Sequence, residues 1–261
     1  MKKMKVSLLQ MNIIPGDLIA NRENAVQLIN QAALQHPDIV VLPEMWTTAY
    51  QLEGIANICD KYGMPTSDII GSIASENEIN IVAGSYASLE AERVFNTAYI
   101  FDRKGNNIAK YQKIHLFKLM EEHKYIQSGS SHSVFMLDGI KCGIIICYDL
   151  RFPELTRKLA LEGIKLLFVP AQWPAARLDH WITLLKARAI ENQIFIAAVN
   201  RAGEHSKDDF LGGSMVINPW GEILAQGDYK QQIISVELDF SLIDQVKKHI
   251  DVLGDRVPHK Y

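Results

Sequence analysis

The sequence predicts one α/β domain spanning residues 1–261, in which mixed β-sheets are covered by helices. Strand-like apolar runs alternate with segments of helical periodicity, and hairpins are interspersed among them. No linker rich in Pro, Gly or Ser, low-complexity tract or short-period repeat breaks this order. A chain of 261 residues is long enough to bury a substantial core in one domain.

In the first half, short apolar and β-branched runs predict strands, and apolar residues spaced three and four apart predict helices. Strands are expected at 5–11, 38–42 and 79–86, and helices at 21–36 and 66–77. Thr66 or Ser67 is the candidate N-cap of the second helix, because a hydroxyl can accept from a free helical N–H. Residues 95–101 and 108–111 flank DRKGN and are expected to form a hairpin, whereas the polar stretch 113–133 is expected to be irregular.

The second half repeats this alternation. Strands are expected at 140–146, 166–170, 194–199 and 233–238, and helices at 153–162, 180–192 and 241–250. Asp138-Gly139 predicts a tight hairpin between 134–137 and 140–146, and Pro219-Trp220-Gly221 predicts another between 214–218 and 222–225.

Composition excludes several classes of protein. With 48% hydrophobic and 22% charged residues and a net charge of −3, the chain has no basic footprint for nucleic acid and no polybasic membrane patch. No apolar stretch is long enough to span a membrane, and the apolar run at the start is too short for a signal peptide. Three cysteines form no paired framework, so we expect a cytoplasmic protein.

The segment 139–154, GIKCGIIICYDLRFPE, contains the strongest candidate nucleophile. Its apolar run ends at Cys147, turns polar at once, and leads to a helix start at Pro153. Backbone N–H groups and partial positive charge gather where a strand leads into a helix, which favours a reactive thiol. Alternatively, Cys147 is a small apolar core residue. Asp149 and Arg151 are expected to hold the turn by an ion pair.

Other reactive residue types also follow apolar runs. Glu44 comes directly after the strand at 38–42, and Lys113 opens the irregular segment that also contains Glu121 and Glu122. Each of these residues could instead be a paired structural charge or a solvated one. Together with Cys147 they form a coherent site: a carboxylate accepts the thiol proton, and an ammonium stabilises the oxyanion. That chemistry is acyl transfer from an amide to water through a thioester, and it needs no metal.

Three segments carry a specific family resemblance. LPEMW (42–46), KIHLF (113–117) and CYDLRFPE (147–154) resemble the three signature segments of the nitrilase superfamily of carbon–nitrogen hydrolases, in the same order. The similarity continues through PAQWP (170–174), HWITLLKARAIENQ (180–193) and GGSMVINPWGEI (212–223). The resemblance implies Glu44 as general base, Lys113 as oxyanion stabiliser and Cys147 as nucleophile.

The resemblance also implies a second glutamate in the segment after the lysine, seven residues before a glycine. Glu122 fits this spacing, with Gly129 following, and Glu121 is the alternative. The backbone N–H of Tyr148 would be the second oxyanion donor. The family fold is a four-layer α-β-β-α sandwich, and its members pair into homodimers or build larger homo-oligomers.

The branch of the family follows from further residues. Nitrilases carry tryptophan directly after the nucleophile, whereas Tyr148 stands here, which favours an amide substrate. The chain looks most like the omega-amidases, which hydrolyse the terminal amide of 2-oxo dicarboxylate monoamides such as 2-oxoglutaramate or 2-oxosuccinamate. Arg177 is the candidate partner of the substrate carboxylate, because guanidinium can bind carboxylate through two hydrogen bonds. The candidate pocket walls are Trp46, Tyr50, Phe117 and Trp173.

The sequence alone is compatible with three other functions. Another branch of the superfamily, such as an N-carbamoyl amide hydrolase, is the alternative within enzymes. A non-catalytic binding protein of the same fold and a redox-sensing thiol are alternatives of other classes. We expect no cofactor and no metal, since no His/Cys spacing typical of zinc and no phosphate-loop pattern occurs.

Overall fold

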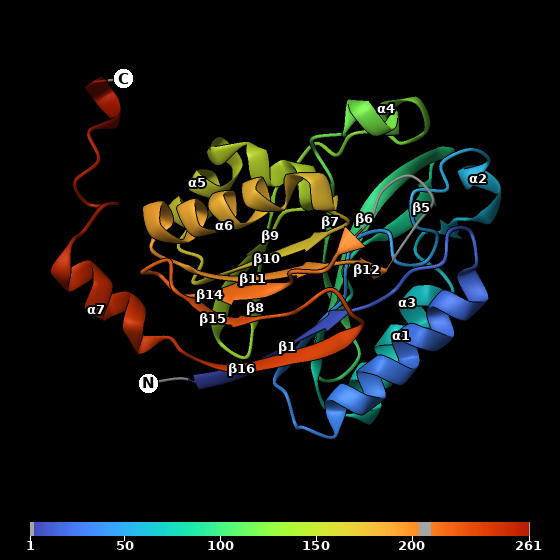
Figure 1. Ribbon diagram of the computed structural model, residues 1–261, viewed down its shortest axis with the longest axis horizontal. Coiled ribbons are helices and arrows are strands. Elements are labelled where there is room, and N and C mark those ends of the chain that lie inside the picture. Colours follow the sequence, from blue (N-terminus) through green and yellow to red (C-terminus); the bar gives the residue numbers. More distant parts are fainter. Residues whose placement is uncertain (1–2, 204–209, 261) are drawn as a thin grey trace.

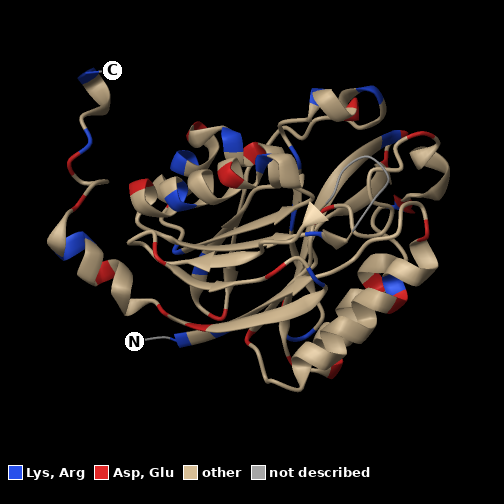
Figure 2. Ribbon diagram, viewed as in Figure 1, with Lys and Arg blue, Asp and Glu red and all other residues tan. Residues whose placement is uncertain are grey.

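The computed structural model describes residues 3–203 and 210–260. Two β-sheets pack face to face, and helices cover the outer face of each sheet (Figure 1). The layers therefore follow the order α-β-β-α, which confirms the fold expected from the sequence resemblance. Basic and acidic residues are interspersed on the helices and loops visible in Figure 2, so these outer layers carry mixed charge.

The first sheet has eight strands in the order β16-β1-β2-β4-β6-β5-β3, with β7 paired to β6. β1, β2 and β4 run parallel to one another, and β16 and β6 add antiparallel neighbours, so the sheet is mixed. Its strands are β1 (Lys3–Gln10), β2 (Ile39–Val41), β3 (Asp60–Lys61), β4 (Asn80–Val82), β5 (Tyr86–Glu90), β6 (Arg93–Phe101), β7 (Asn107–Gln112) and β16 (Gln232–Asp239).

The second sheet has six strands in the order β15-β14-β11-β10-β9-β8. Its centre, β9-β10-β11, is parallel, and its flanking strands are antiparallel. Its strands are β8 (Ser133–Leu137), β9 (Ile140–Ile144), β10 (Leu166–Ala171), β11 (Phe195–Asn200), β14 (Met215–Ile217) and β15 (Ile223–Gln226). A separate two-stranded ribbon joins β12 (Ala202–Gly203) and β13 (Phe210–Leu211).

The helices α1 and α3 lie over the first sheet, and α5 and α6 lie over the second (Figure 1). The helices are α1 (Leu18–Ala33), α2 (Ile55–Ile58), α3 (Thr66–Glu76), α4 (Glu122–Tyr125), α5 (Pro153–Leu161), α6 (Leu178–Asn192) and α7 (Ser241–His249). Short 3₁₀ turns occur at Lys118–Met120, Cys147–Arg151, Ala175–Arg177 and Pro258–Lys260. Among the described residues, no helix combines the length and apolarity needed to cross a bilayer.

The side-chain alternation of the central strands builds two cores. In β1, Val6 and Leu8 pack between the sheets, while Leu9 packs on the opposite face beneath the helices. In β2, Ile39 and Val41 face the inter-sheet core and Val40 faces the helices, so every residue of this strand is buried. This explains why the central strands appear in the sequence as continuous apolar runs rather than as alternating ones.

The three predicted hairpins are confirmed as antiparallel pairs, β6–β7, β8–β9 and β14–β15. Asp138 and Gly139, between β8 and β9, have φ values of 46° and 82°, as a tight turn of the hairpin type requires. The predicted strand at 79–86 is too long. The observed strand β4 ends at Val82 because the chain turns at Gly84 (φ 57°), where a Cβ atom would lie 1.9 Å from the carbonyl oxygen of Pro43.

The predicted cap of the helix at 66–77 is also wrong. No side chain caps α3, and its first residue is Thr66 itself. The Thr66 N–H instead donates to Asp60 Oδ2 at 3.3 Å, and the Thr66 hydroxyl accepts from Arg22. The carboxylate of Asp60 therefore binds the first N–H of this helix.

Candidate active site

Cys147 lies in the turn between the second sheet and α5. The strand β9 ends at Ile144, and the chain passes through two buried isoleucines before the 3₁₀ turn that begins at Cys147. The Cys147 side chain is buried, and its backbone has φ 45°, in the left-handed region that non-glycine residues seldom adopt. The position at the carboxyl end of a parallel strand is where ligands collect in α/β sheets.

Three charged side chains from distant parts of the sequence meet in one buried cluster. Lys113 Nζ lies 2.8 Å from Glu44 Oε1 and 2.9 Å from Glu122 Oε2, and all three side chains are fully buried. Glu44 follows β2, Lys113 follows β7, and Glu122 is the first residue of α4. Two carboxylates therefore share one ammonium.

The carboxylate of Glu44 is held by several further donors. Its Oε1 accepts from Tyr50 Oη at 2.7 Å and from Asn96 Nδ2 at 2.9 Å, and its Oε2 accepts from the backbone N–H of Gln172 at 2.9 Å. Lys113 Nζ also donates to Tyr50 Oη at 3.0 Å. Because these donors come from different elements, the carboxylate has one fixed orientation within the cluster.

The Cys147 thiol lies beside this cluster, and its Sγ lies 3.9 Å from the carbonyl oxygen of Gln172, whose N–H binds Glu44. Burial raises the pKa of the thiol, the negative charge of Glu44 raises it further, and the nearby Lys113 ammonium lowers it. The net pKa lies well above the ordinary value, so the resting sulfur is a protonated thiol. A thiol in this state needs a base to act as a nucleophile, and Glu44 is the neighbouring carboxylate.

Lys113 remains charged despite its burial. Burial lowers its pKa, but the carboxylates of Glu122 and Glu44 raise it more, so that the net pKa is raised. A fully buried ammonium next to a thiol can stabilise negative charge that develops on a carbonyl oxygen. The group therefore has the charge and the position that an oxyanion site requires.

The two adjacent glutamates of the irregular segment have different environments. Glu122 is fully buried, and its carboxylate accepts from Lys113 Nζ and from the backbone N–H of Phe117 at 2.7 Å. The Glu121 side chain is 57% exposed and pairs with Lys124. The structure thus brings Glu122 into the cluster and leaves its neighbour Glu121 at the surface.

A small pocket opens beside Cys147. The residues that line it are Tyr50, Phe117, Met120, Cys147, Tyr148, Arg151, Gln172, Trp173, Pro174 and Arg177. Four of the predicted pocket residues, Tyr50, Phe117, Trp173 and Arg177, are therefore at its walls. Trp46 is not: it is 1% exposed, packs edge-on against Tyr86 in the core, and donates from its indole N–H to Ala83 O.

Arg151 is a pocket residue that the sequence reasoning missed. The expected ion pair between Arg151 and Asp149 is wrong, because the Asp149 carboxylate is bound by other donors and Arg151 lies 4.7 Å over the ring of Trp173. Its position four residues after the candidate nucleophile, in the same turn, is the sequence signal that could have placed it near the site. Gln172, which holds Glu44, has a sequence signal of its own, because it stands just past the apolar run of the strand expected at 166–170. Asn96, which also holds Glu44, has no comparable signal.

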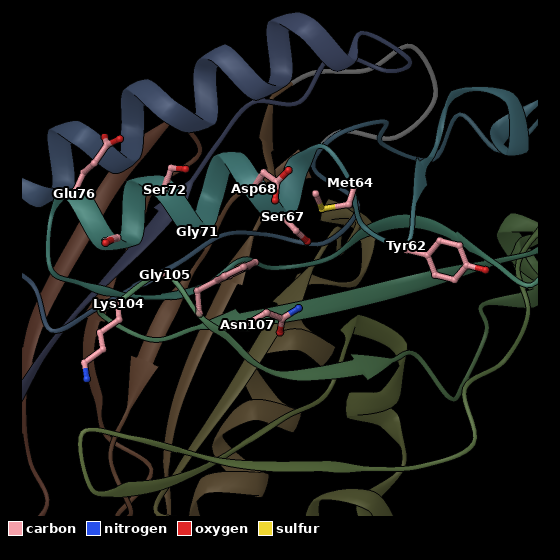
Figure 3. A pocket seen from close by; sticks show the side chains of 12 residues that line it. Tyr62, Met64, Ser67, Asp68, Gly71, Ser72, Glu76, Lys104, Gly105 and Asn107 are labelled. Atoms are coloured by element: carbon pink, nitrogen blue, oxygen red, sulfur yellow. The ribbon is translucent and has the colours of Figure 1, made fainter.

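A wider groove lies elsewhere, between α3 and the β6–β7 turn (Figure 3). Polar side chains from both elements line it, among them Ser67, Asp68 and Glu76 of α3 and Lys104 of the turn. This groove and the Cys147 pocket share no lining residue. Within the described residues, no group of three or more His, Cys, Asp or Glu side chains could hold a metal ion.

Comparisons with known proteins agree with the geometry. The sequence model of the carbon–nitrogen hydrolase family matches residues 5–248. The chain is 42% identical to a 2-oxoglutaramate amidase of Bacillus subtilis (strain 168), over 97% of each chain. It is 30% identical to omega-amidase NIT2-B of Xenopus laevis, over 100% of this chain and 98% of the relative. A crystal structure of a CN-hydrolase superfamily protein from Xanthomonas campestris superposes with a TM-score of 0.92, at 29% identity and 98% coverage of both chains.

Proposed function

The chain belongs to the carbon–nitrogen hydrolase family and is a hydrolase that acts on an amide, and on that premise we propose that it is an omega-amidase. Its substrate would be a small carboxylate-bearing amide such as 2-oxoglutaramate or 2-oxosuccinamate, cleaved through a thioester on Cys147. The observation that carries this proposal is a buried thiol 3.9 Å from Gln172 O, beside a carboxylate that binds the Gln172 N–H and shares an ammonium with a second carboxylate.

The proposed reaction begins when Cys147 Sγ attacks the amide carbonyl carbon while Glu44 accepts the thiol proton. The electron pair of the C=O bond moves onto oxygen, where the positive charge of Lys113 and the backbone N–H of Tyr148 stabilise it. Collapse of this intermediate breaks the C–N bond. The proton held by Glu44 passes to the leaving nitrogen, so that ammonia departs and a thioester remains.

Hydrolysis of the thioester then restores the enzyme. Glu44 takes a proton from water as the water oxygen attacks the thioester carbonyl, and the same proton returns to sulfur as the C–S bond breaks. The role proposed for Glu122 is to fix Lys113, since it binds the ammonium through both carboxylate oxygens at 3.1 and 2.9 Å. Tyr50 stays protonated, because burial first and the neighbouring carboxylates next raise its pKa, and it can donate to Glu44 throughout.

Two guanidinium groups at the pocket favour a substrate that has an anionic end. The Arg177 guanidinium lies 5.9 Å over the ring of Phe117, and that of Arg151 lies 4.7 Å over the ring of Trp173. Both arginines line the pocket next to Cys147. Guanidinium binds carboxylate through charge-assisted hydrogen bonds, and a pocket this small accommodates a short substrate. The Bacillus subtilis relative, a 2-oxoglutaramate amidase, fits this substrate class.

We also propose that the protein is cytoplasmic and acts as a homodimer or a larger homo-oligomer. All three cysteines are free thiols, as a reducing compartment would keep them. Leu161 of α5 and Ile190 of α6 are large apolar side chains exposed on the outer helical layer, and an interface would remove them from water. Light scattering coupled to size-exclusion chromatography measures the oligomeric state.

The deciding experiment is ammonia release from a set of amides by the wild-type protein and by Cys147→Ala. We expect turnover of 2-oxoglutaramate or 2-oxosuccinamate, weak turnover of a matched amide without the carboxylate, and none in the variant. Rapid quenching and mass spectrometry of the wild-type protein should detect an acyl adduct on Cys147.

Turnover of N-carbamoyl amino acids faster than that of 2-oxoglutaramate would instead favour the N-carbamoyl amide hydrolase branch of the family. Unchanged turnover in Cys147→Ala would contradict the proposed cysteine mechanism. Thermal unfolding of the variant provides the control, because alanine fills much of the cysteine volume and should leave the fold intact.

A further inference from the structure

The buried carboxylate of Asp149 has no part in the steps proposed above, yet it has four hydrogen-bond contacts close to Cys147. The residue is completely buried, two positions after the nucleophile. Its Oδ2 accepts from Tyr111 Oη at 2.7 Å and from the Ile146 N–H at 3.0 Å. Its Oδ1 accepts from the N–H of His115 at 2.9 Å and lies 2.7 Å from His115 Nδ1. Because a carboxylate only accepts hydrogen bonds, His115 Nδ1 carries the proton in this contact.

These donors come from two chain segments that each hold one reactive group. Tyr111 and His115 lie two residues before and two residues after Lys113. Ile146 lies directly before Cys147, and Asp149 lies two residues after it. One carboxylate therefore binds the chain on both sides of Lys113 to the chain on both sides of Cys147.

The same contacts hold an unfavourable backbone conformation. The left-handed φ of 45° at Cys147 is one that non-glycine residues seldom adopt. Asp149 closes a ring around this residue, since its N–H donates to Ile146 O at 3.0 Å while its carboxylate accepts from Ile146 N. The His115 ring is fixed in turn, stacked on Phe152 with a centroid distance of 3.6 Å and an interplanar angle of 8°.

We propose that Asp149 and His115 are positioning residues that hold the Cys147 thiol and the Lys113 ammonium at the separation needed for attack. This inference rests on the cysteine mechanism proposed above. His115 does not line the Cys147 pocket, so it acts through Asp149 and not through the substrate. Loss of its hydrogen bond should therefore slow the attack of the thiol and leave substrate binding nearly unchanged.

Two substitutions of His115 separate its hydrogen bond from its ring. His115→Phe keeps the stack on Phe152 and removes the Nδ1–H donor, whereas His115→Asn removes the stack and keeps an N–H donor in the place of Nδ1. His132 provides a matched control, because its Nε2 contacts Glu162 at 2.7 Å and its side chain is 31% exposed, against 29% for His115. His132→Phe thus removes, away from the site, a histidine of similar exposure from its contact with a carboxylate, here the half-buried one of Glu162.

We expect kcat for ammonia release to fall about tenfold to a hundredfold in His115→Phe, with KM changed by less than about threefold. His115→Asn should recover most of that loss, and His132→Phe should match the wild type. The rate of Cys147 alkylation by iodoacetamide should follow the same order. Alkylation does not depend on any amide turnover, so it tests the positioning even if the proposed substrate is wrong.

Wild-type kcat and wild-type alkylation in His115→Phe would overturn the inference. It would also fail if His115→Asn were as slow as His115→Phe, since the ring and not the hydrogen bond would then matter. If His115→Phe does not fold, Tyr111→Phe decides, because it removes a single donor to Asp149 Oδ2 and keeps the ring. A slowing of alkylation by about threefold or more would support the inference, and an unchanged rate would overturn it.

Discussion

Glu122→Gln removes one of the two carboxylates that bind the Lys113 ammonium. Glu122 accepts from Lys113 Nζ at 2.9 and 3.1 Å and from the Phe117 N–H at 2.7 Å. Glutamine has one carbonyl oxygen and one NH₂ group, so it cannot accept on both sides. Because Lys113 Nζ contacts both carboxylate oxygens, it faces the amide NH₂ group in either orientation of the glutamine and loses one of these two contacts.

The size of the effect follows from these contacts. A buried donor without a partner costs about 1–3 kcal/mol, and a hydrogen bond to a charged group is at the upper end of that range. If Lys113 is the group that shifts, a loss of about 2 kcal/mol in transition-state stabilisation lowers kcat roughly thirtyfold. KM should change less, because Glu122 does not line the pocket beside Cys147. The free energy of unfolding should fall by a similar amount.

Glu121→Gln is the matched control, one residue away. Glu121 is 57% exposed, and its contact is with Lys124 at the surface, where an ion pair contributes at most about 1 kcal/mol. We expect its kcat to stay within about twofold of the wild type. The assay is steady-state ammonia release, with thermal unfolding of each variant to separate activity from stability. A wild-type kcat in Glu122→Gln, or an equal loss in both variants, would refute the role given to the buried carboxylate.

Glu44→Gln should lower the acylation rate by about 10²–10⁴ and leave KM nearly unchanged, because glutamine cannot accept the thiol proton; a wild-type acylation burst would mean that another base acts. Burial and the charge of Glu44 raise the pKa of Cys147, so the thiol stays protonated in the resting enzyme. A plot of log(kcat/KM) against pH should therefore show no rise from thiol ionisation near about pH 8.5, where a free cysteine titrates. A tenfold rise between about pH 7.5 and 9 would contradict this. Arg177→Met and Arg151→Met should each raise KM for 2-oxoglutaramate about tenfold or more and leave KM for an amide without a carboxylate unchanged. An equal rise in KM for both substrates would exclude a role of these arginines in carboxylate binding.

Most of the fold could be predicted because its signals are local. The apolar run that ends at Ile146 and the Asp138-Gly139 turn each depend on a few adjacent residues, and both correspond to structure. Glu44 and Cys147 could be identified as candidates for the same reason, since each comes soon after an apolar strand, whereas Lys113 could be identified through its KIHLF segment.

Contacts across the fold could not be predicted in this way. Trp46 belongs to the same motif as Glu44, but its indole turns into the core toward Ala83. Arg151 has an acidic neighbour two residues away, but that carboxylate is already bound by Tyr111, His115 and Ile146. A local pairing rule fails at such positions, because two of the competing donors, Tyr111 and His115, lie 38 and 34 residues from the carboxylate in the sequence.

The difference between Glu121 and Glu122 also arises from the fold around them and not from their own residue type. As adjacent acids they are indistinguishable by composition, charge or periodicity, and only the family spacing to Gly129 favours Glu122. The difference arises because Glu121 adopts a left-handed backbone conformation, with φ 56°, between the 3₁₀ turn Lys118–Met120 and α4. This reversal leaves Glu121 in solvent and directs the next residue inward, where Lys113 and the Phe117 N–H bind its carboxylate. A substitution that disfavours the left-handed conformation at Glu121, such as Glu121→Val, should therefore reduce kcat although the native side chain makes no contact with the cluster. Glu121→Gly, which adopts that conformation freely, should not. Equal activity of the two variants would show that the backbone reversal is not what orients Glu122.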